Sequence, residues 1–336
     1  MLNKKAKLNK KVFDKDVEQL PTRNGYGDGV VIAGEKDENI VVLCADLTDS
    51  TRSVDFAKKF PERFIEMGVA EQNLATIAAG LGVSGKIAFI SSYATFSPGR
   101  NWEQIRTTIA YNDSNVKIIG AHAGVSVGPD GATHQAIEDI ATMRVMAGMK
   151  LFIPCDAIEA KKATIVSAQN WGPYYIRLTR EKTPIITTED TPFIPEKAEI
   201  FWESAGKKSR FKKPQVAIIG CGPLVHNALL AAKELDEEGI GTMVINSHTI
   251  PLDEKTILDA ALKCGAVVTV EEHQIAGGMG SAVSELLSKN MPTPMEFIGM
   301  KGTFGESGDP NELIEKYEMD AKSIKEAVKK VLKRKK

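Results

Sequence analysis

The feature that most constrains the fold of this chain is a repeated alternation of short apolar runs with longer segments of helical periodicity. Strands that alternate with helices pair in parallel, because each helix returns the chain to the edge where the next strand begins. The sequence therefore predicts a mainly parallel sheet with helices on both faces. Its expected strands are Ile40 to Cys44, Lys86 to Ser91, Val116 to Gly120, Lys150 to Pro154 and Tyr174 to Leu178.

The alternation lapses between Ile186 and about Lys213, in a stretch with prolines and a cluster of basic residues. A short strand is expected there around residues 200–202. The pattern then resumes with QVAIIGCG and closes with the helix SIKEAVKKVLKR, and 336 residues suffice for two cores. We predict two successive three-layer α/β/α domains with mainly parallel sheets, at residues 1–190 and 214–336, joined by a linker at 191–213.

Composition excludes several classes of protein. The chain has 43 lysine and arginine residues and 44 aspartate and glutamate residues, so its net charge of −1 favours neither nucleic acid nor an anionic membrane as a partner. Its four cysteines are widely spaced and form no CxxC, which indicates buried thiols in a reducing compartment. The basic N-terminus has no apolar core, and no run approaches membrane-spanning length, so we expect a cytoplasmic protein.

A short run, GVAEQN, opens a predicted amphipathic helix at Glu71. Apolar residues recur after it at helical spacing, so one stripe of the helix should face the core while Glu71 stands at the N-terminal turn. A glutamate in that place can simply stabilise the helix dipole. The residues of the expected apolar stripe are Leu74, Ile77, Ala78 and Leu81.

Further polar and aromatic residues follow the next predicted strands. One strand ends in the aromatics Tyr93 and Phe96, and the next ends at His122, before a glycine-rich loop that leads to His134. Because the carboxyl ends of neighbouring parallel strands meet at one edge of a sheet, these residues should gather beside Glu71.

These motifs carry a family resemblance. The segments GVAEQN, SSYATF and AHAGVSVGPDGATHQ, in this order and at this spacing, resemble the pyrimidine-binding half of transketolase. The C-terminal part resembles the transketolase C-terminal domain, so the resemblance covers nearly the whole chain. The match is nearest to the separately encoded C-terminal subunit of a split transketolase.

The resemblance implies thiamin diphosphate chemistry. By motif match, Glu71 is the glutamate that hydrogen-bonds the pyrimidine ring nitrogen and favours the imino tautomer, whose exocyclic nitrogen takes the thiazolium C2 proton. Phe96 and Tyr93 fall on the positions that stack against the pyrimidine. A further stacking aromatic found in many members corresponds roughly to Gly99 here, which is a departure from the pattern.

The resemblance also implies a sugar-phosphate site. His122 matches a histidine that contacts substrate oxygens, His134 one that moves protons near the reacting carbon, and Asp130 an aspartate that orients a donor hydroxyl. The residues that align with the phosphate-binding cluster are Arg23, Ser50 and Arg180. Taken singly, Arg23 and Arg180 are equally compatible with an ordinary surface position.

A complete transketolase has an N-terminal half that binds the diphosphate and the metal, and this sequence contains no such half. The resemblance therefore implies a separate N-terminal subunit, an α2β2 assembly, and Mg²⁺ or a similar divalent cation held by the partner. This chain itself is expected to supply no metal ligand.

Two glycine motifs point elsewhere and are set aside. Gly27, Asp28 and Gly29 spell the GDG of the diphosphate motif, but the asparagine that should follow is absent, so we expect a turn. The segment around Gly220 and Gly222 resembles the start of a dinucleotide fingerprint, but no third glycine or terminal acidic residue follows.

Other groups also have simple structural interpretations. The GGMG at residues 277–280 could hold an anion at a helix N-terminus, but a tight strand-to-helix turn is the more economical prediction. A zinc site at His134 and Glu138 is weakly supported because no cysteine accompanies it. The remaining histidines, expected to be packing or surface residues, are His226, His248 and His273.

We therefore predict the C-terminal subunit of a transketolase, which transfers a two-carbon ketol unit between ketose and aldose phosphates. A relative for an unusual sugar phosphate is an open alternative. Deoxyxylulose-phosphate synthase is disfavoured because that family places an acidic residue where His122 stands, and the DGATHQ loop disfavours a 2-oxoacid dehydrogenase β-subunit. A non-catalytic binding or scaffold protein on the same fold is the alternative from another class.

Overall fold

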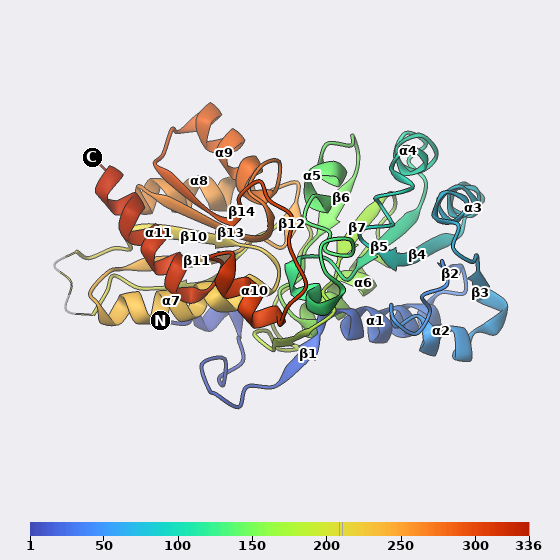
Figure 1. Ribbon diagram of the computed structural model, residues 1–336, viewed down its shortest axis with the longest axis horizontal. Helices are drawn as coiled ribbons and strands as arrows, with labels where there is room; N and C mark the ends of the chain where they lie inside the picture. Colours follow the sequence, from blue (N-terminus) through green and yellow to red (C-terminus); the bar gives the residue numbers. More distant parts are fainter. Residues whose placement is uncertain (208, 210, 336) are drawn as a thin grey trace.

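Two twisted sheets, one of seven strands and one of five, form the cores of two α/β domains that lie side by side along the long axis of the molecule (Figure 1). The computed structural model describes residues 1–207, 209 and 211–335. The prediction of two α/β domains with mainly parallel sheets is confirmed.

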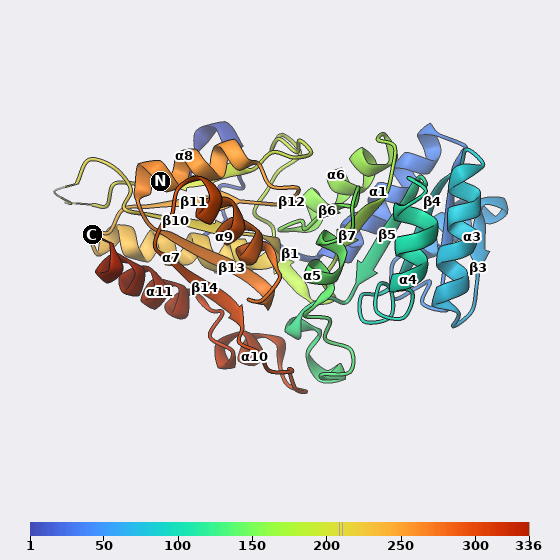
Figure 2. The ribbon, with the colours of Figure 1, turned by 90° about the horizontal axis from the view of Figure 1, so that it is seen from above.

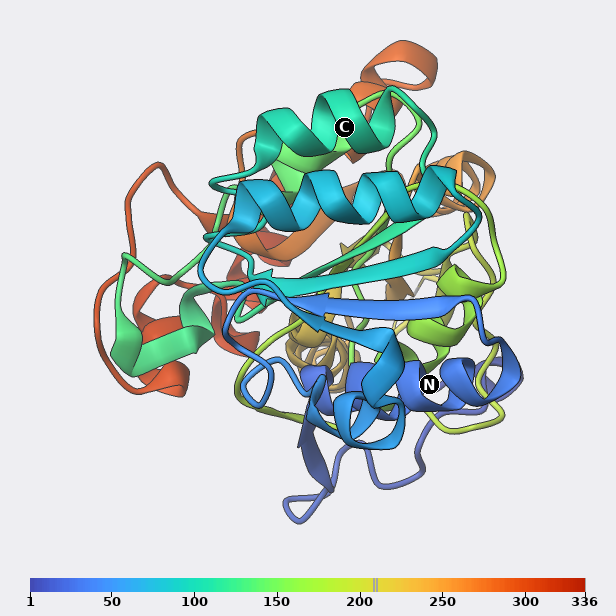
Figure 3. The same cartoon turned by 90° about the vertical axis from the view of Figure 1, so that its right-hand side faces the viewer.

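The first sheet has the order β12-β6-β7-β5-β4-β2-β3 and is parallel except for β12 at its edge. Its strands are β2 (Ile40–Cys44), β3 (Phe64–Glu66), β4 (Ile87–Tyr93), β5 (Val116–Ala121), β6 (Lys150–Phe152), β7 (Tyr174–Arg177) and β12 (Thr249–Ile250). One face is covered by α3 (Glu71–Val83), by α4 (Trp102–Gln104) with the π-helix η3 (Ile105–Ala110), and by α5 (Asp139–Arg144). The other face is covered by α1 (Thr22–Lys36), α2 (Val54–Lys59) and α6 (Ala157–Ala168) (Figure 3).

The second sheet has the order β14-β13-β10-β11-β9, and only β9 runs antiparallel. Its strands are β9 (Glu199–Glu203), β10 (Val216–Gly220), β11 (Thr242–Asn246), β13 (Val267–Gln274) and β14 (Met295–Met300). Helices α7 (Val225–Glu237) and α11 (Ala321–Arg334) cover one face, α8 (Glu254–Cys264) and α9 (Met279–Asn290) the other. Strand β9 confirms the short strand expected around residues 200–202.

The GDG segment is helical, so the prediction of a turn there is wrong. It lies inside α1, which packs closely along α6. A Cβ atom at Gly25 would lie 1.9 Å from the carbonyl oxygen of Ala157, and one at Gly29 would lie 2.8 Å from that of Lys161. The glycines therefore allow two helices to approach more closely than side chains would permit.

Helix α3 begins at Glu71 as predicted, but its buried stripe differs from the expected one. Leu74 and Ala78 are buried, whereas Ile77 is 43% exposed and faces outward. The inward stripe consists largely of small residues that pack against β4 and η3, which leaves Ile77 on the opposite side of the helix.

Each domain contributes a segment that packs on the other. Residues 2–13, the lead-in before β1 (Gln19–Pro21), pack on the second domain. There the Asn3 amide donates to the carbonyl oxygen of Phe201 at 2.9 Å, and Phe13 contacts Trp202 edge to face. In return, β12 of the second domain pairs with β6. Beside these, β1 pairs with β8 (Lys182–Pro184) in a small antiparallel sheet.

All four cysteines are buried free thiols, as their sequence context predicts. Among the described residues, no helix combines the length and the apolar character needed to span a membrane.

Candidate active site

The candidate site lies at the carboxyl edge of the first sheet, where the loops after β2, β4, β5 and β7 come together. These loops carry the predicted residues Ser50, Tyr93, Phe96, His122 and Arg180. The position follows from the topology, since the parallel strands all end at the same edge.

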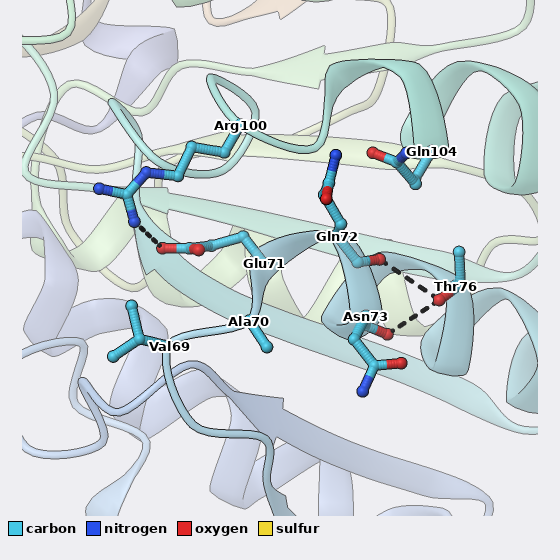
Figure 4. A pocket seen from close by; sticks show the side chains of 8 residues that line it. All are labelled: Val69, Ala70, Glu71, Gln72, Asn73, Thr76, Arg100 and Gln104. Carbon is cyan, nitrogen blue, oxygen red and sulfur yellow. Dashed lines mark hydrogen bonds and ion pairs between the residues drawn. The ribbon is translucent and has the colours of Figure 1, made fainter.

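Glu71 is the first residue of α3 and is only 5% exposed, with its carboxylate in the first turn where the helix dipole favours negative charge. Asn101 fixes this turn by donating from Nδ2 to the backbone oxygen of Glu71 at 2.9 Å. Glu71 lines a cavity of about 710 Å³ (Figure 4). The other lining residues are Val69, Ala70, Gln72, Asn73, Thr76, Arg100 and Gln104.

Arg100 links Glu71 to the aromatic positions, and no sequence motif pointed to it. Its Nη1 donates to Glu71 Oε1 at 2.9 Å, and its guanidinium lies over the ring of Phe96, 4.1 Å from the centroid. One planar group thus contacts both the carboxylate and the aromatic face that were predicted to hold the pyrimidine. The only available sequence signal was its place beside Gly99, where the family pattern is broken.

Four rings from three segments meet at this edge. Tyr93 stacks on His122 with ring centroids 3.8 Å apart, and on Phe96 at 5.9 Å. His134 stands edge-on to both aromatics, with centroids 5.5 Å from Phe96 and 6.2 Å from Tyr93. The two histidines and two aromatics expected to share a site are therefore in contact.

Arg23 and His122 form the centre of a cationic corner. From the first turn of α1, Arg23 Nη1 donates to the carbonyl oxygen of Ser50 at 2.8 Å and lies 3.4 Å from His122 Nε2. Because a guanidinium can only donate hydrogen bonds, the facing Nε2 is the acceptor and the ring proton is on Nδ1. Ser50 thus joins the site through its backbone.

The His122 ring is held neutral. Burial and the nearby cations lower its pKa to about 3, with Arg23 and Arg180 the largest charge effects and His134 and Arg52 the smaller ones. Burial also lowers the pKa of Arg23, as do Arg52 and Arg180. These shifts follow from the gathering of several positive groups around His122.

Two buried nitrogens of this corner lack a partner. Neither Arg23 Nε nor His122 Nδ1 has a hydrogen-bond acceptor among the residues that the structure describes. Unpaired buried donors are rare because each costs about 1–3 kcal/mol. Two of them on neighbouring side chains in a cationic corner suit an anionic or oxygen-rich ligand.

Arg180 and Asp130 occupy the rim. Arg180 Nη1 donates to the carbonyl oxygen of Val127 at 2.9 Å and pairs with Glu181 at 3.2 Å. Asp130 is exposed at the end of the 3₁₀ segment η4 (Val125–Asp130), on the loop between the two site histidines. The structure brings Arg180 to the cationic corner and leaves Asp130 open to solvent.

Arg52 is a further cation that sequence reasoning missed. It sits in the loop after β2 with a positive φ of 69°, and its Nε donates to Asn24 Oδ1 at 3.1 Å, beside Arg23. Asp49, which is 85% exposed, lies 3.9 Å from its guanidinium. No motif marks Arg52, since its position depends on how the loop folds back onto α1.

No cluster of three or more histidine, cysteine, aspartate or glutamate side chains in the described part of the chain is arranged to hold a metal ion. Its three remaining histidines, His226, His248 and His273, are involved in packing and hydrogen bonds away from this edge. Glycines 277 and 278 make the predicted strand-to-helix turn before α9.

Both domains match known protein families. Residues 18–185 match the family described as "Transketolase, pyrimidine binding domain", and residues 206–324 match "Transketolase, C-terminal domain". The chain belongs to the transketolase family. Within it, the chain is the C-terminal section of a split transketolase, with one domain of each kind.

Individual relatives agree with this assignment. A protein of Methanocaldococcus jannaschii named as a transketolase C-terminal section is 42% identical over 304 residues, which are 90% of this chain and 93% of that one. The 6-deoxy-6-sulfo-D-fructose transketolase subunit SqwH of Clostridium sp. (strain MSTE9) is 37% identical over 324 residues, 96% of this chain and 98% of that one. A solved structure described as a split gene transketolase, inactive beta4 tetramer, has 43% identity and a TM-score of 0.86, and covers 94% of this chain and 100% of its own.

Proposed function

We propose that this chain is the C-terminal subunit of a thiamin-diphosphate-dependent transketolase that moves a two-carbon ketol unit from a ketose phosphate to an aldose phosphate. The observation that carries the proposal is the convergence of three groups at one sheet edge. They are the carboxylate of Glu71, the stacked rings of Tyr93 and Phe96, and the cationic corner of Arg23 and His122.

The carboxylate and the rings fit an aminopyrimidine. Phe96 already carries a planar cationic group on its face, and that same group is bound by Glu71. When bound, thiamin diphosphate supplies a thiazolium carbon that can lose its proton and act as a nucleophile. Glu71 hydrogen-bonds the ring nitrogen and holds or shares a proton there, while Phe96 and Tyr93 fix the plane of the ring.

The cationic corner fits a sugar phosphate. Arg23, Ser50 and Arg180 hold the phosphate, because guanidinium groups pair with its oxygens through charge-assisted hydrogen bonds. The neutral His122 donates its Nδ1 proton to a sugar oxygen, which accounts for the lack of an acceptor at that atom among the described residues.

Two residues on the loop from His122 to His134 complete the sugar site. His134, edge-on to both aromatic rings, is positioned to move a proton at the carbon that reacts. Asp130 accepts a hydrogen bond from a hydroxyl of the donor sugar. Both assignments follow the family pattern.

A separate N-terminal subunit supplies the rest of the active site. It binds the diphosphate and Mg²⁺ or a similar divalent cation, and the working enzyme is an α2β2 assembly. Val69, which lines the Glu71 cavity and is 68% exposed, and the outward-facing Ile77 of α3, which is 43% exposed, support a covering partner.

A transketolase for an unusual sugar is the second candidate, favoured by the relative whose name specifies a sulfo-sugar. A sulfonate is a monoanion, whereas a phosphate near neutral pH is largely dianionic, so the number of cations at the corner bears on the choice. A non-catalytic scaffold is disfavoured because Glu71, His122 and His134 all lie at one site.

Reconstitution with the N-terminal subunit tests the proposal. That subunit is identified by native pull-down of this chain and mass spectrometry of what co-purifies. The complex should bind thiamin diphosphate and transfer ketol units between sugar phosphates, and Glu71→Ala should abolish transfer without loss of assembly. Retained turnover in that variant would refute the role of Glu71, and a complex that binds no thiamin diphosphate would favour the scaffold.

A further inference from the structure

The segment of residues 122–136, which we call the sugar loop, carries three proposed substrate residues at the edge of the first domain. Its two ends are joined where the Gly124 amide donates to the carbonyl oxygen of Ala136 at 2.8 Å. Its middle, η4, lies against α10 (Pro310–Lys316) of the second domain (Figure 2). The loop is therefore held from outside its own domain.

One carboxylate of the second domain supports the base of this loop. Glu272, on β13, accepts a hydrogen bond from the backbone amide of Ser126 at 2.6 Å, and it also bonds to the Ser126 side chain. The carboxylate lies flat against Gly124, where a Cβ atom would fall 2.2 Å from Glu272 Oε1. Gly124 has a φ of 91°, so both space and backbone conformation require glycine there.

The strand that carries Glu272 is itself fixed against the first domain. The carbonyl oxygen of Glu272 accepts from Arg177 Nη2 at 2.8 Å, and Arg177 Nε forms a buried pair with Asp139 at 2.8 Å. Glu272 is 3% exposed, so its side chain has almost no freedom to move. Burial raises its pKa, while Arg177 and the hydrogen bonds from Ser126 act in the opposite direction.

We propose that Glu272 is a positioning residue. Through it, the C-terminal domain holds the sugar loop in the position that binds the sugar phosphate. This inference rests on the proposed function, because it gives the loop its substrate. It assigns the second domain a part in sugar binding through the contact of Glu272 with Ser126 and Gly124.

The neighbouring residue, Glu271, is a matched control. It is equally buried on the same strand and also accepts backbone amides, from Met279 at 2.7 Å and Gly280 at 2.8 Å. Its partners belong to α9 of its own domain, because successive side chains of a strand point to opposite faces. Changing Glu271 perturbs the second domain without touching the sugar loop.

The experiment compares Glu272→Ala, Glu272→Gln and Glu271→Gln in the reconstituted complex. We expect Glu272→Ala to raise KM for the ketose phosphate about tenfold, and Glu272→Gln about threefold because an acceptor oxygen remains. The affinity for thiamin diphosphate should stay within about twofold of the wild type in both. Glu271→Gln should lower thermal stability and leave KM for the sugar unchanged.

Amide hydrogen exchange of the same proteins gives a readout that does not need turnover. Glu272→Gln should speed exchange within residues 122–136, and Glu271→Gln should not. Gly124→Ala disrupts the same contact from the loop side, and it replaces Glu272→Ala in the experiment if that variant fails to fold. Wild-type KM and exchange in the Glu272 variants, or an equal rise of KM in Glu271→Gln, would overturn the inference. A wild-type complex that transfers no ketol unit would instead refute the proposed function.

Discussion

The carboxyl edges of the two sheets occupy the same place in two similar folds, but their buried polar groups differ in whether they are paired. At the first edge, Arg23 Nε and His122 Nδ1 are buried donors without an acceptor in the described part of the protein. At the second edge, Glu271 and Glu272 are buried acceptors that are satisfied by backbone amides. The site where a helix N-terminus could hold an external anion, before α9, is filled by the protein's own carboxylate.

The difference shows how one architecture serves two purposes. An unpaired buried donor costs about 1–3 kcal/mol, so the first edge keeps polar groups ready for a ligand at the expense of stability. At the second edge the buried carboxylates are paired with backbone amides, and Glu272 supports the neighbouring loop of the first domain. Substitutions at the first edge should therefore act mainly on activity, and those at the second mainly on stability or position.

The sharpest test of this comparison is the same substitution at both edges. Glu71→Gln should reduce ketol transfer by the reconstituted enzyme about 10³-fold, within the range for loss of a proton-transferring group, and should leave the melting temperature within a degree or two. Glu271→Gln should lower the melting temperature and leave turnover per folded molecule unchanged. Steady-state assays and calorimetry on both variants measure this, and a stability loss confined to Glu71→Gln would break the comparison.

Removing the central guanidinium should have the next largest effect. Arg23→Met should reduce kcat/KM for the ketose phosphate roughly 10- to 100-fold, because a charge-assisted hydrogen bond contributes about 1.5–3 kcal/mol. Arg106→Met, an exposed arginine on η3, is the control and should have no effect. Equal losses in the two variants would show a non-specific effect of positive charge.

The pH behaviour of His122 sharpens the comparison further. Its folded-state pKa of about 3 lies below the value of about 6.5 for a free histidine, so the unfolded chain binds a proton that the folded chain excludes. The contribution of His122 to stability is therefore complete above about pH 6.5 and is lost as the pH falls toward 3, by at most about 1.4 kcal/mol per unit.

Two measurements check this sign. The ring resonances of His122 should not titrate between pH 5 and 8, and Arg23→Met should raise the pKa toward its ordinary value. His122→Asn should flatten the acid limb of the unfolding free energy. A titration of His122 near pH 6.5 in the unaltered protein would contradict the neutral, Nδ1-protonated ring.

A smaller effect is expected at the third cation. Arg52→Gln should raise KM for a ketose phosphate about three- to tenfold, because the guanidinium lies beside Arg23 but its side chain is 38% exposed and screened by water. The unphosphorylated ketose should show no change. The same loss for both sugars would show that Arg52 shapes its loop without acting on the phosphate.

The smallest expected change is at Arg100, whose guanidinium contacts Glu71 and Phe96. A pyrimidine ring must replace both contacts, and a half-exposed ion pair contributes no more than about 1 kcal/mol. Arg100→Gln should therefore tighten the binding of thiamin diphosphate about two- to fivefold, as measured by calorimetric titration of the complex. Weaker binding would mean that Arg100 stays and helps to hold the cofactor.

The sequence predicted the parts of the fold that depend on local pattern. Strand Ile40–Cys44 has the predicted limits, because a fully apolar run between polar turns leaves little choice. The GDG at residues 27–29 was wrongly predicted to be a turn, because the helix against which Gly29 packs, α6, lies more than a hundred residues further along the chain. Ile77 was assigned to the core because periodicity alone does not show which small residues a helix uses for packing.

The sequence likewise predicted only those parts of the candidate site that carry a motif. The ordered motifs located Glu71, Phe96, His122 and His134 at one edge, where Tyr93 contacts the rings of the last three. The tautomer of His122 could not be predicted, because it depends on the donor that faces Nε2. Arg52 and Arg100 carry no motif, and their contacts arise only when separate loops fold together.

The lead-in described with the fold bears on the order of events during synthesis. Asn3 donates to the carbonyl oxygen of Ile200, which is added 197 residues later, and the carbonyl oxygen of Val12 bonds His226 of α7. Domains generally fold as units while the chain emerges, N-terminal part first. The contacts of Asn3 and Val12 with the second domain can therefore form only after that domain has been synthesised. That domain therefore contacts both the first residues of the chain and the sugar loop.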